Sequence, residues 1–520
     1  MVQFLSGPQA AEYIKDGDSI ALLGNGGAVL EPRMVYRCIE ERFLATGSPR
    51  DLSLSHSTGI GDKAVEGMSR FAHEGMVKRV IGGHWGWSPR MQQLAAEGKI
   101  QAYNLPLGVI VSQYREIAAK RPGLITKTGL GTYADPRIDG GRLNLATPND
   151  LVRLIEIDGQ TWLHYRPWQV DVGIVRGTTA DEDGNITFEE EVAFLEAQAI
   201  AQAAHNCGGI VIAQVHHVAG RGSLEPQLVK MPGRLVDIVA VDPDQWQTSE
   251  GRYDPALCGR QRKPIGSLPA MPLTQRKVIA RRAAMEVKPG MIFNLGYGMP
   301  DGVASVCSEE GITNTLTATI EQGLVGGTPA SGDIFGAAYN ASAFVDSPSQ
   351  FDFYSGGGLD LTCLGLAQVD ERGNVNVSRF GTTIAGCGGF IDISQSAGTC
   401  IFCGTFTAGG LKTSIVDGEL RILHEGHSRK FVKRVEHVTF SGQHALDEEQ
   451  TVWYVTERCV FRLGSTGLEL AEIAPGVDLQ TDILDQMGFL PLIRADLKLM
   501  DPRIFDEGLM GLAHQAEALR

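Results

Sequence analysis

The residue with the clearest chemical potential is Glu321, which follows an apolar run at 316–320 and precedes a glycine-rich stretch at 322–329. A short apolar run that contains Thr and Ile and is closed by glycine predicts a buried strand ending in a tight turn. A carboxylate at that place combines a fixed position, partial desolvation and open access, which a nucleophilic carboxylate needs. The competing interpretation is a solvated glutamate at a turn, the usual environment of an acidic residue.

Four glycine-rich loops offer backbone N–H groups that can bind an anion or polarise a carbonyl. They cover residues 24–27, 129–132, 296–300 and 386–390. For any single loop, a tight turn between a strand and a helix explains the glycines equally well. The segment 129–134 matches the dinucleotide-binding spacing, but no apolar strand precedes it, so we interpret the match as chance. The sequence has no Walker A motif and no G-x-S-x-G motif, which disfavours a P-loop enzyme and that type of serine hydrolase.

The histidines and cysteines give little support to metal or redox chemistry. The closest histidine groups are His216 with His217 and His424 with His427, and neither has an acidic ligand at metal spacing in the sequence. We therefore expect surface or hydrogen-bonded core histidines and no metal. The C-x-x-C at 400–403 lies in a strand-like apolar run without a second pair, which indicates core cysteines.

Three aspartates end or interrupt apolar runs, namely Asp237, Asp360 and Asp392. A side-chain oxygen at such a place usually accepts a backbone N–H at a helix start or a turn. We expect structural roles for all three rather than chemistry.

The composition is that of a globular protein with more than one domain. A chain of 520 residues is too long for one core, and 43% hydrophobic and 21% charged residues are ordinary for folded domains. The net charge of −15 argues against nucleic acid as a partner. No apolar run is long enough for a membrane span, and the first residues lack the basic and apolar regions of a signal peptide. Nine scattered cysteines favour reduced thiols in a cytoplasm.

The two halves of the chain echo each other, which predicts an internal duplication. The matching segments are 15–26 with 288–298, 181–188 with 370–377, and 209–213 with 399–403. In the second pair, a turn with Gly-Asn leads into a strand in both halves, and the segments lie 189 residues apart.

This echo predicts an N-terminal domain at 1–242, a polar linker at 243–272 and a C-terminal domain at 273–520. In each domain, short apolar strands alternate with amphipathic segments such as 191–204 and 276–287. That alternation predicts an α/β fold with a largely parallel sheet. Sites in such sheets form at the carboxyl ends of strands, where the glutamate would lie.

In combination, these motifs resemble those of family I CoA-transferases. The segment 319–329 resembles the family's catalytic segment, with a glutamate before x-Gly and a second Gly-Gly-x-Pro. Segment 294–300 is similar to N-L-G-x-G-x-P, and segment 386–392 to G-x-G-G-x-x-D. Segments 129–136 and 403–412 resemble the bacterial short-chain branch, of the acetate/propionate CoA-transferase type. The resemblance covers essentially the whole chain, with fused α-like and β-like halves related to succinyl-CoA:3-oxoacid CoA-transferase.

The resemblance implies a fold of two homologous open α/β domains, of the NagB/RpiA/CoA-transferase-like kind. It implies that Glu321 is the catalytic nucleophile. The residues implied to form the oxyanion and substrate loops are Gly26, Gly27, Asn294, Gly296, Gly298, Gly388 and Gly389. The residues implied to bind CoA are Gly326, Gly327, Gly409, Gly410 and Lys412.

One position departs from the family pattern. The segment 104–108 reads N-L-P-L-G, where the family usually has N-L-P-Q-G. The resemblance implies that Leu107 replaces a glutamine whose amide contacts the acyl-CoA or the carboxylate near the nucleophile. Leucine cannot donate a hydrogen bond. We therefore expect Leu107 to affect substrate specificity.

The implied reaction is a ping-pong exchange of CoA between a short-chain acyl-CoA and a free carboxylic acid through a glutamyl-CoA thioester. CoA would be a co-substrate, with no permanently bound cofactor, in a homodimer or homotetramer of the bacterial cytoplasm. The rivals are an acyl-CoA hydrolase that uses the same glutamate and a non-catalytic acyl-CoA-binding protein. A sugar-phosphate isomerase on a similar fold is weaker, because it would not explain the duplication.

Overall fold

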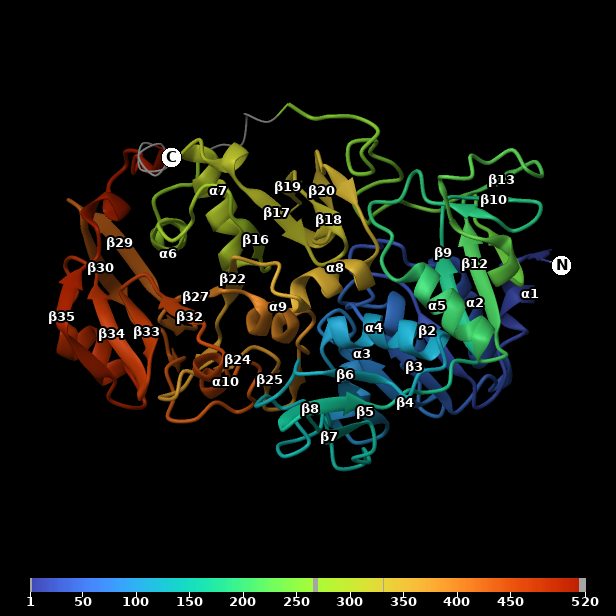
Figure 1. Cartoon of the computed structure of the whole chain (residues 1–520), viewed down its shortest axis with the longest axis horizontal. Helices are drawn as coiled ribbons and strands as arrows, with labels where there is room; N and C mark the ends of the chain where they lie inside the picture. Colours follow the sequence, from blue (N-terminus) through green and yellow to red (C-terminus); the bar gives the residue numbers. More distant parts are fainter. Residues whose placement is uncertain (1, 265–269, 331, 514–520) are drawn as a thin grey trace. The chain divides into compact units, whose positions relative to one another are not determined.

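The computed structural model describes residues 2–264, 270–330 and 332–513, and these fall into two compact units (Figure 1). Unit 1 comprises the described residues of Met1–Lys263, Ile320–Phe353 and Gly381–Asp392. Unit 2 comprises those of Pro264–Thr319, Tyr354–Phe380 and Ile393–Arg520. Each unit contains a parallel sheet with helices, so the predicted α/β fold class is confirmed.

The main sheet of unit 1 has eight strands in the order β1-β15-β12-β9-β2-β3-β4-β5, and every neighbouring pair is parallel. The strands are β1 (Gln3–Leu5), β2 (Ser19–Leu22), β3 (Leu52–His56), β4 (Val77–Gly82), β5 (Gln101–Asn104), β9 (Val172–Arg176), β12 (Ile210–Val215) and β15 (Ile238–Val241). The all-parallel pairing brings the carboxyl ends of these strands to one edge of the sheet.

Helices cover both faces of this sheet, because successive residues of one strand pack in two different core clusters. Ile20 and Leu22 of β2 belong to one core cluster, whereas Ala21 belongs to the other. The helices are α1 (Gly7–Ala11), α2 (Arg33–Thr46), α3 (Pro89–Ala96), α4 (Leu107–Ala118) and α5 (Ala197–Asn206). Residues of α1, α2 and α3 pack in the first cluster and residues of α4 and α5 in the second. Burial on both faces explains why the strands are apolar runs without polar alternation.

Unit 1 also contains smaller sheets. One has the order β13-β10-β11-β14 and another the order β6-β8-β7. Their strands are β10 (Thr179–Asp181), β11 (Ile186–Thr187), β13 (His217–Ala219), β14 (Val229–Met231), β6 (Leu124–Thr126), β7 (Val152–Ile157) and β8 (Gln160–Tyr165). Two short antiparallel pairs follow Glu321, and they join β18 (Leu324–Val325) with β21 (Ala343–Phe344) and β19 (Thr328–Pro329) with β20 (Ala338–Tyr339).

In unit 2 the main sheet runs in the order β17-β16-β22-β27-β32-β33-β34-β35, and its first five strands are parallel. The strands are β16 (Ile292–Leu295), β17 (Thr317–Ile320, whose last residue lies in unit 1), β22 (Leu361–Gly365), β27 (Thr399–Cys403), β32 (Thr451–Val455), β33 (Cys459–Gly464), β34 (Gly467–Ile473) and β35 (Leu492–Leu499). Its helices include α6 (Gln275–Ala284), α7 (Gly302–Glu309) and α10 (Gly442–Asp447). The helices α8 (Ser347–Ser355) and α9 (Phe390–Ser396) begin in unit 1 and end in unit 2.

Most local predictions agree with these elements, and one helix start differs. The predicted helix at 276–287 corresponds to α6, but the one predicted at 191–204 begins only at Ala197. Leu195 has a φ of +48°, which interrupts a right-handed helix. Glu191 instead forms a buried ion pair with Arg176 at 2.9 Å.

The duplication is visible in the hydrogen bonds of the echoing turns. In unit 1, Asp181 accepts the backbone N–H groups two and four residues later, at 3.0 and 2.9 Å, and the side-chain amide of Asn185 at 3.0 Å. In unit 2, Asp370 accepts the corresponding three bonds at 3.1, 3.0 and 3.0 Å, the last from Asn374. The same turn is therefore built twice by an aspartate and an asparagine at the same spacing.

The compact units are not the continuous segments of the predicted domains. Residues 320–353 and 381–392 come from the second half of the chain but belong to unit 1. Of the predicted linker at 243–272, the first part packs into unit 1, whereas residues 265–269 lie outside the described residues. The boundaries at 242 and 273 stay a prediction about the duplication.

Two further observations concern the expected environment of the chain. Among the described residues, no helix has the length and apolar character required to cross a lipid bilayer. All nine cysteines are free, and those at 400 and 403 are buried on β27, as expected for core cysteines.

Two glycines of unit 2 test how tightly the echoing turn is packed. Gly373 and Gly418 have similar φ values of +76° and +77°. A Cβ at Gly373 would lie 2.6 Å from Leu463 and 2.7 Å from the Tyr454 hydroxyl, whereas a Cβ at Gly418 would have no atom within 4 Å. Gly418→Ala should cost about 1–2 kcal/mol of backbone strain. Gly373→Ala adds overpacking, which costs about 1–3 kcal/mol more. Equal urea-unfolding curves for the two variants would contradict this.

Candidate active site

Glu321 lies where β17 ends, as predicted, and its carboxyl group is largely removed from water although the residue is partly exposed. Burial raises the pKa of this carboxyl from 4.5 to about 7. Hydrogen bonds from the Gln322 side chain, at 3.3 Å, and from the backbone N–H of Gly389 lower this pKa in part. Gly323, with a φ of +99°, closes the turn, and a Cβ there would collide with the carbonyl of Val345.

The first glycine loop, residues 24–27, lies beside this turn. The Gln322 amide donates to Asn25 Oδ1 at 3.1 Å, and Asn25 Nδ2 donates to the carbonyl of Phe335 at 2.9 Å. Gly27 has a φ of +74°, and a Cβ there would collide with the carbonyl of Asp333. Glycine is therefore required for this loop to approach the segment that follows Glu321.

The loop 386–389 is fixed by the carboxyl ends of β4 and β5. Gly388 donates its N–H to the carbonyl of Gly83 at 2.9 Å. Asn104, the last residue of β5, accepts the N–H of Cys387 at 3.1 Å and donates to the carbonyl of Gly83 at 2.6 Å. Since Gly389 also donates to the Glu321 carboxylate, these bonds set the position of that donor.

Leu107 begins α4 and contacts the same loop through its backbone. Its N–H donates to the carbonyl of Gly388 at 2.9 Å, and its side chain is buried, with 2% exposed. The next N–H, of Gly108, donates to Asp392 at 3.1 Å. Pro106, the residue before the helix, supplies no side-chain cap, so Asp392 takes that role.

The three aspartates have the structural roles expected from the sequence. Asp392 accepts backbone N–H groups at the start of α4, Asp237 accepts that of Val211 at 2.9 Å, and Asp360 accepts that of Ile292 at 2.8 Å. Burial raises the pKa of Asp392 to about 8, and the nearby Glu321 charge contributes to this increase. Asp392 is therefore protonated more easily than an ordinary aspartate, which reduces its repulsion of the Glu321 carboxylate.

Unit 1 brings together part of the predicted set. It contains the nucleophile candidate, Leu107 and the loop glycines Gly26, Gly27, Gly388 and Gly389. It also contains Gly326 and Gly327, whose φ values of +74° and +77° and tight contacts with the strand pair after Glu321 explain both glycines by packing alone.

The other predicted residues lie in unit 2, namely Asn294, Gly296, Gly298, Gly409, Gly410 and Lys412. Asn294 is buried, and its Nδ2 donates to the carbonyl of Thr319 at 3.2 Å. This bond supports β17 two residues before the candidate nucleophile. A role of these six residues toward substrate stays a prediction.

Sequence reasoning missed several polar residues of the site. Asn25, Gln322 and Asn104 were visible within the motifs, but nothing local indicated their hydrogen bonds. His84 lies in a run of glycines after β4, and it pairs with Gly386 in an isolated bridge. Burial lowers the pKa of His84 to about 4, so this imidazole is neutral beside the loop. The glycine-rich surroundings of His84 were the signal that could have identified it.

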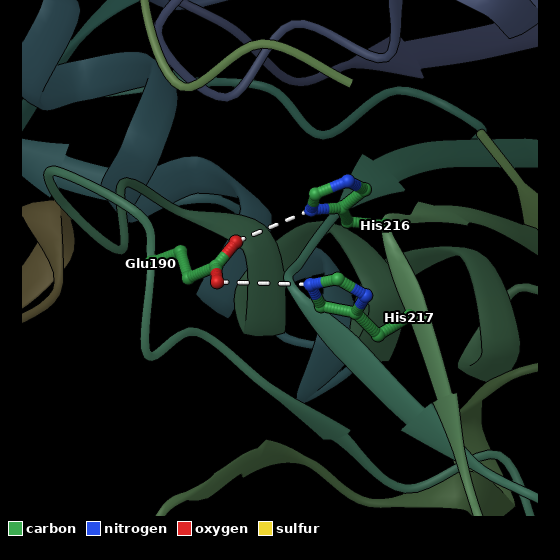
Figure 2. A group of neighbouring side chains, drawn as sticks. All are labelled: Glu190, His216 and His217. Atoms are coloured by element: carbon green, nitrogen blue, oxygen red, sulfur yellow. Dashed lines mark hydrogen bonds and ion pairs between the residues drawn. The ribbon is translucent and has the colours of Figure 1, made fainter. Parts of the chain in front are cut away.

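The interpretation of the histidine pair 216–217 was wrong on one point. Glu190 lies beside both rings, at 3.2 Å from His216 and 3.6 Å from His217 (Figure 2). The carboxylate comes from a segment 26 residues earlier in the chain, which spacing within a motif does not show.

Comparison with known proteins identifies the family. A coenzyme A transferase family model matches residues 8–242. The caffeate CoA-transferase of Acetobacterium woodii is 49% identical, and the match covers 98% of this chain and 99% of that protein. The chain belongs to the coenzyme A transferase family. The family I resemblance, including the fused halves, is thereby confirmed.

Two Escherichia coli proteins extend the comparison. The acetate CoA-transferase YdiF of strain K12 is 47% identical, with 98% of this chain and 96% of that protein covered. The solved structure of the acyl-CoA transferase YdiF from strain O157:H7, a thioester complex with CoA, has a TM-score of 0.93 at 46% identity and covers 98% of this chain and 97% of that one. This CoA-transferase therefore shares its whole fold with an enzyme solved as a CoA thioester.

The raised pKa of Glu321 predicts a pH-dependent gain of stability in Glu321→Gln. The pKa of the Glu321 carboxyl is about 7 in the folded state and 4.5 in the unfolded state. The contribution of this group to stability is therefore fully present below pH 4.5 and is lost as the pH rises through 7. Glutamine cannot ionise, so the variant should unfold with a free energy higher by about 1–3 kcal/mol at pH 8, and with little change at pH 4.

Urea unfolding at both pH values measures this difference. Glu41→Gln is the matched control, because the Glu41 side chain is 63% exposed on α2 and forms an ion pair with Arg37 at 3.9 Å. A gain for Glu321→Gln of equal size at pH 4 and pH 8 would show that the carboxyl is not held out of water.

Proposed function

We propose that this CoA-transferase exchanges CoA between a short-chain acyl-CoA and a free carboxylic acid through a glutamyl-CoA thioester on Glu321. One observation carries the proposal: a desolvated carboxylate at the end of β17 accepts an N–H from a glycine loop. Such a carboxylate is fixed, more basic than an ordinary glutamate and beside a donor that can stabilise an oxyanion.

The chemistry runs in two half-reactions. The Glu321 carboxylate attacks the thioester carbonyl, the C–S bond breaks, and an acyl-glutamyl anhydride and CoA thiolate form. The thiolate then attacks the glutamyl carbonyl and expels the free acid, which leaves a glutamyl-CoA thioester. A second carboxylate reverses these steps and departs as its CoA thioester. One thioester replaces another in the exchange, so no ATP hydrolysis is required.

Each attack creates a negatively charged oxygen that needs donors. We assign the backbone N–H of Gly389 and the loop 386–389 to one side of this oxyanion, and the loop at Gly26 and Gly27 to the other. Loss of a donor of this kind typically slows a reaction by about 10²–10³-fold. The neutral His84 beside Gly386 adds no positive charge, so backbone dipoles provide the stabilisation in this assignment.

The relatives support the reaction class and leave the acids open. The names of the relatives refer to caffeate and to acetate, and YdiF has been solved as a thioester with CoA. We propose a short-chain acid as acceptor, acting in a bacterial cytoplasm, and a homodimer or homotetramer. The predicted contacts of Gly326, Gly327, Gly409, Gly410 and Lys412 with CoA belong to the same proposal.

Intact mass spectrometry after mixing with acetyl-CoA tests the intermediate. Wild-type protein should gain the mass of CoA less one water, as expected for a thioester, whereas Glu321→Gln and Glu321→Ala should not. Transfer to an acceptor acid should fall by more than about 10³-fold in both variants, because neither has a nucleophilic oxygen.

The exposed control Glu41→Gln should behave as wild type. Free CoA released without an adduct and without an acceptor would indicate a hydrolase instead. Near-normal transfer by Glu321→Ala would show that another residue is the nucleophile.

Leu107 makes a separate prediction about the acids. An apolar wall disfavours a second carboxylate, since burial of an unpaired charge costs several kcal/mol, whereas one more buried methylene gains about 0.8 kcal/mol. Wild type should therefore prefer butyrate to succinate as acceptor, and Leu107→Gln should shift kcat/KM toward small polar acids.

The comparison uses succinate, acetoacetate, acetate and butyrate with wild type, Leu107→Gln and the apolar control Leu107→Met. The backbone bond from Leu107 to Gly388 exists in all three proteins, so loop position is held constant. An unchanged rank order of the four acids in Leu107→Gln would remove Leu107 from the specificity determinants.

A further inference from the structure

Glu190, His216 and His217 form a cluster that the CoA-transferase reaction does not use. One ligand atom from each residue lies within 4.8 Å of the others (Figure 2). His216 lies between β12 and β13, His217 begins β13, and Glu190 lies in the segment before α5. We propose that this cluster is a binding site for a borderline divalent cation of the Zn²⁺ type.

The spacing of the cluster fits such an ion. Oε2 of Glu190 is 3.2 Å from Nδ1 of His216, and Oε1 of Glu190 is 3.6 Å from Nε2 of His217. Four ligands about 2.0–2.1 Å from a tetrahedral Zn²⁺ are about 3.3 Å apart. The three ligand atoms lie within 4.8 Å of one another, so they must move closer together by up to about 1.5 Å to bind one ion, which partly exposed side chains can do.

The hydrogen bond of His216 favours a cation between the ring and the carboxylate. Its Nε2 lies 3.2 Å from the carbonyl of Pro243, which can only accept, so a neutral ring that makes this bond carries its proton on Nε2. In the neutral ring, Nδ1 then presents a lone pair to the Glu190 carboxylate, which also only accepts. A metal ion satisfies both groups, and donation of the other ring N–H to a backbone carbonyl is the usual arrangement of a metal-bound histidine.

Thr178 fixes the backbone of all three ligands. Its carbonyl accepts the N–H groups of His216 and His217, each at 2.9 Å. Its hydroxyl accepts the N–H of Glu190 at 3.1 Å. Gln247 adds a bond from its side chain to the carbonyl of Glu190 at 2.6 Å. The ligands are thus held in place by a buried residue before any ion arrives, which lowers the entropic cost of binding.

The ligand types indicate which ion binds. Two imidazoles and one carboxylate suit Zn²⁺, Co²⁺ or Ni²⁺, whereas Mg²⁺ and Ca²⁺ prefer oxygen ligands. The side chains of Glu190 and His217 are 31% and 49% exposed, so water can occupy the remaining coordination positions. Three protein ligands with an accessible fourth position give a site that exchanges its ion with solution.

Calorimetric titration of Zn²⁺ into protein dialysed against EDTA tests the site. Wild type should bind one equivalent with low micromolar affinity, and Zn²⁺ should raise the melting temperature. Glu190→Gln, His216→Gln and His217→Gln should each weaken binding by about 10–100-fold and abolish the thermal shift. His217 is the most exposed ligand, so its variant keeps the test valid if another variant does not fold.

The matched control is His73→Gln, because His73 pairs with Glu40 at 2.8 Å without a second histidine and should leave the titration unchanged. Co²⁺ absorption separates this site from cysteine sites, since nitrogen and oxygen ligands give no thiolate charge-transfer band. No binding by wild type, or equal binding by wild type and the three ligand variants, would show that the cluster is an ion pair only.

Discussion

The candidate site depends on one constraint: the carboxyl group of Glu321 must leave water and remain open to a thioester carbonyl. Burial alone would leave the group protonated, and full hydrogen bonding would make the carboxylate a weak nucleophile. The structure lies between these limits, because Gly389 and Gln322 donate to the carboxylate and its pKa still stays at about 7. A Cβ at Gly27 or Gly323 would collide with a backbone carbonyl, which explains why these two positions beside Glu321 are glycine.

This constraint also explains why the candidate site in unit 1 contains residues from both halves of the chain. The edge formed by the carboxyl ends of β4 and β5 presents the carbonyl of Gly83 and the amide of Asn104. Residues 381–392, from the second half, bind to these groups and so bring the Gly389 donor to Glu321. A division of the chain by sequence alone would separate the donor from the edge that positions it. The compact units therefore follow the requirements of the site and not the boundary of the duplication.

The sequence predicted features that depend on neighbouring residues and missed those that depend on folding. The strand before Glu321, the turn after it and the paired turns at Asp181 and Asp370 follow from local patterns, and the structure has all of them. The Gln322–Asn25 bond joins residues 297 positions apart, so no local pattern contains it. The late start of α5 has the same origin, since the partner of Glu191 is Arg176 on β9, 15 residues earlier. Family resemblance supplied the reaction class, which geometry without a substrate could not have named.

Leu107 and Gly108 show how a family segment can change its substrate while it keeps its structure. Both bonds of the segment, from Leu107 to Gly388 and from Gly108 to Asp392, use backbone N–H groups and so do not depend on the side chain at 107. Position 108, in contrast, requires glycine, because a Cβ there would lie 2.5 Å from Asp392 and would collide with Phe351. In the proposed mechanism, position 107 can therefore vary with the acid while the start of α4 continues to hold the oxyanion loop in place. In this mechanism the side chain at 107 affects specificity, while the backbone at 107 and 108 supports transition-state stabilisation. The leucine at the position of the family glutamine is therefore compatible with Glu321 as the nucleophile.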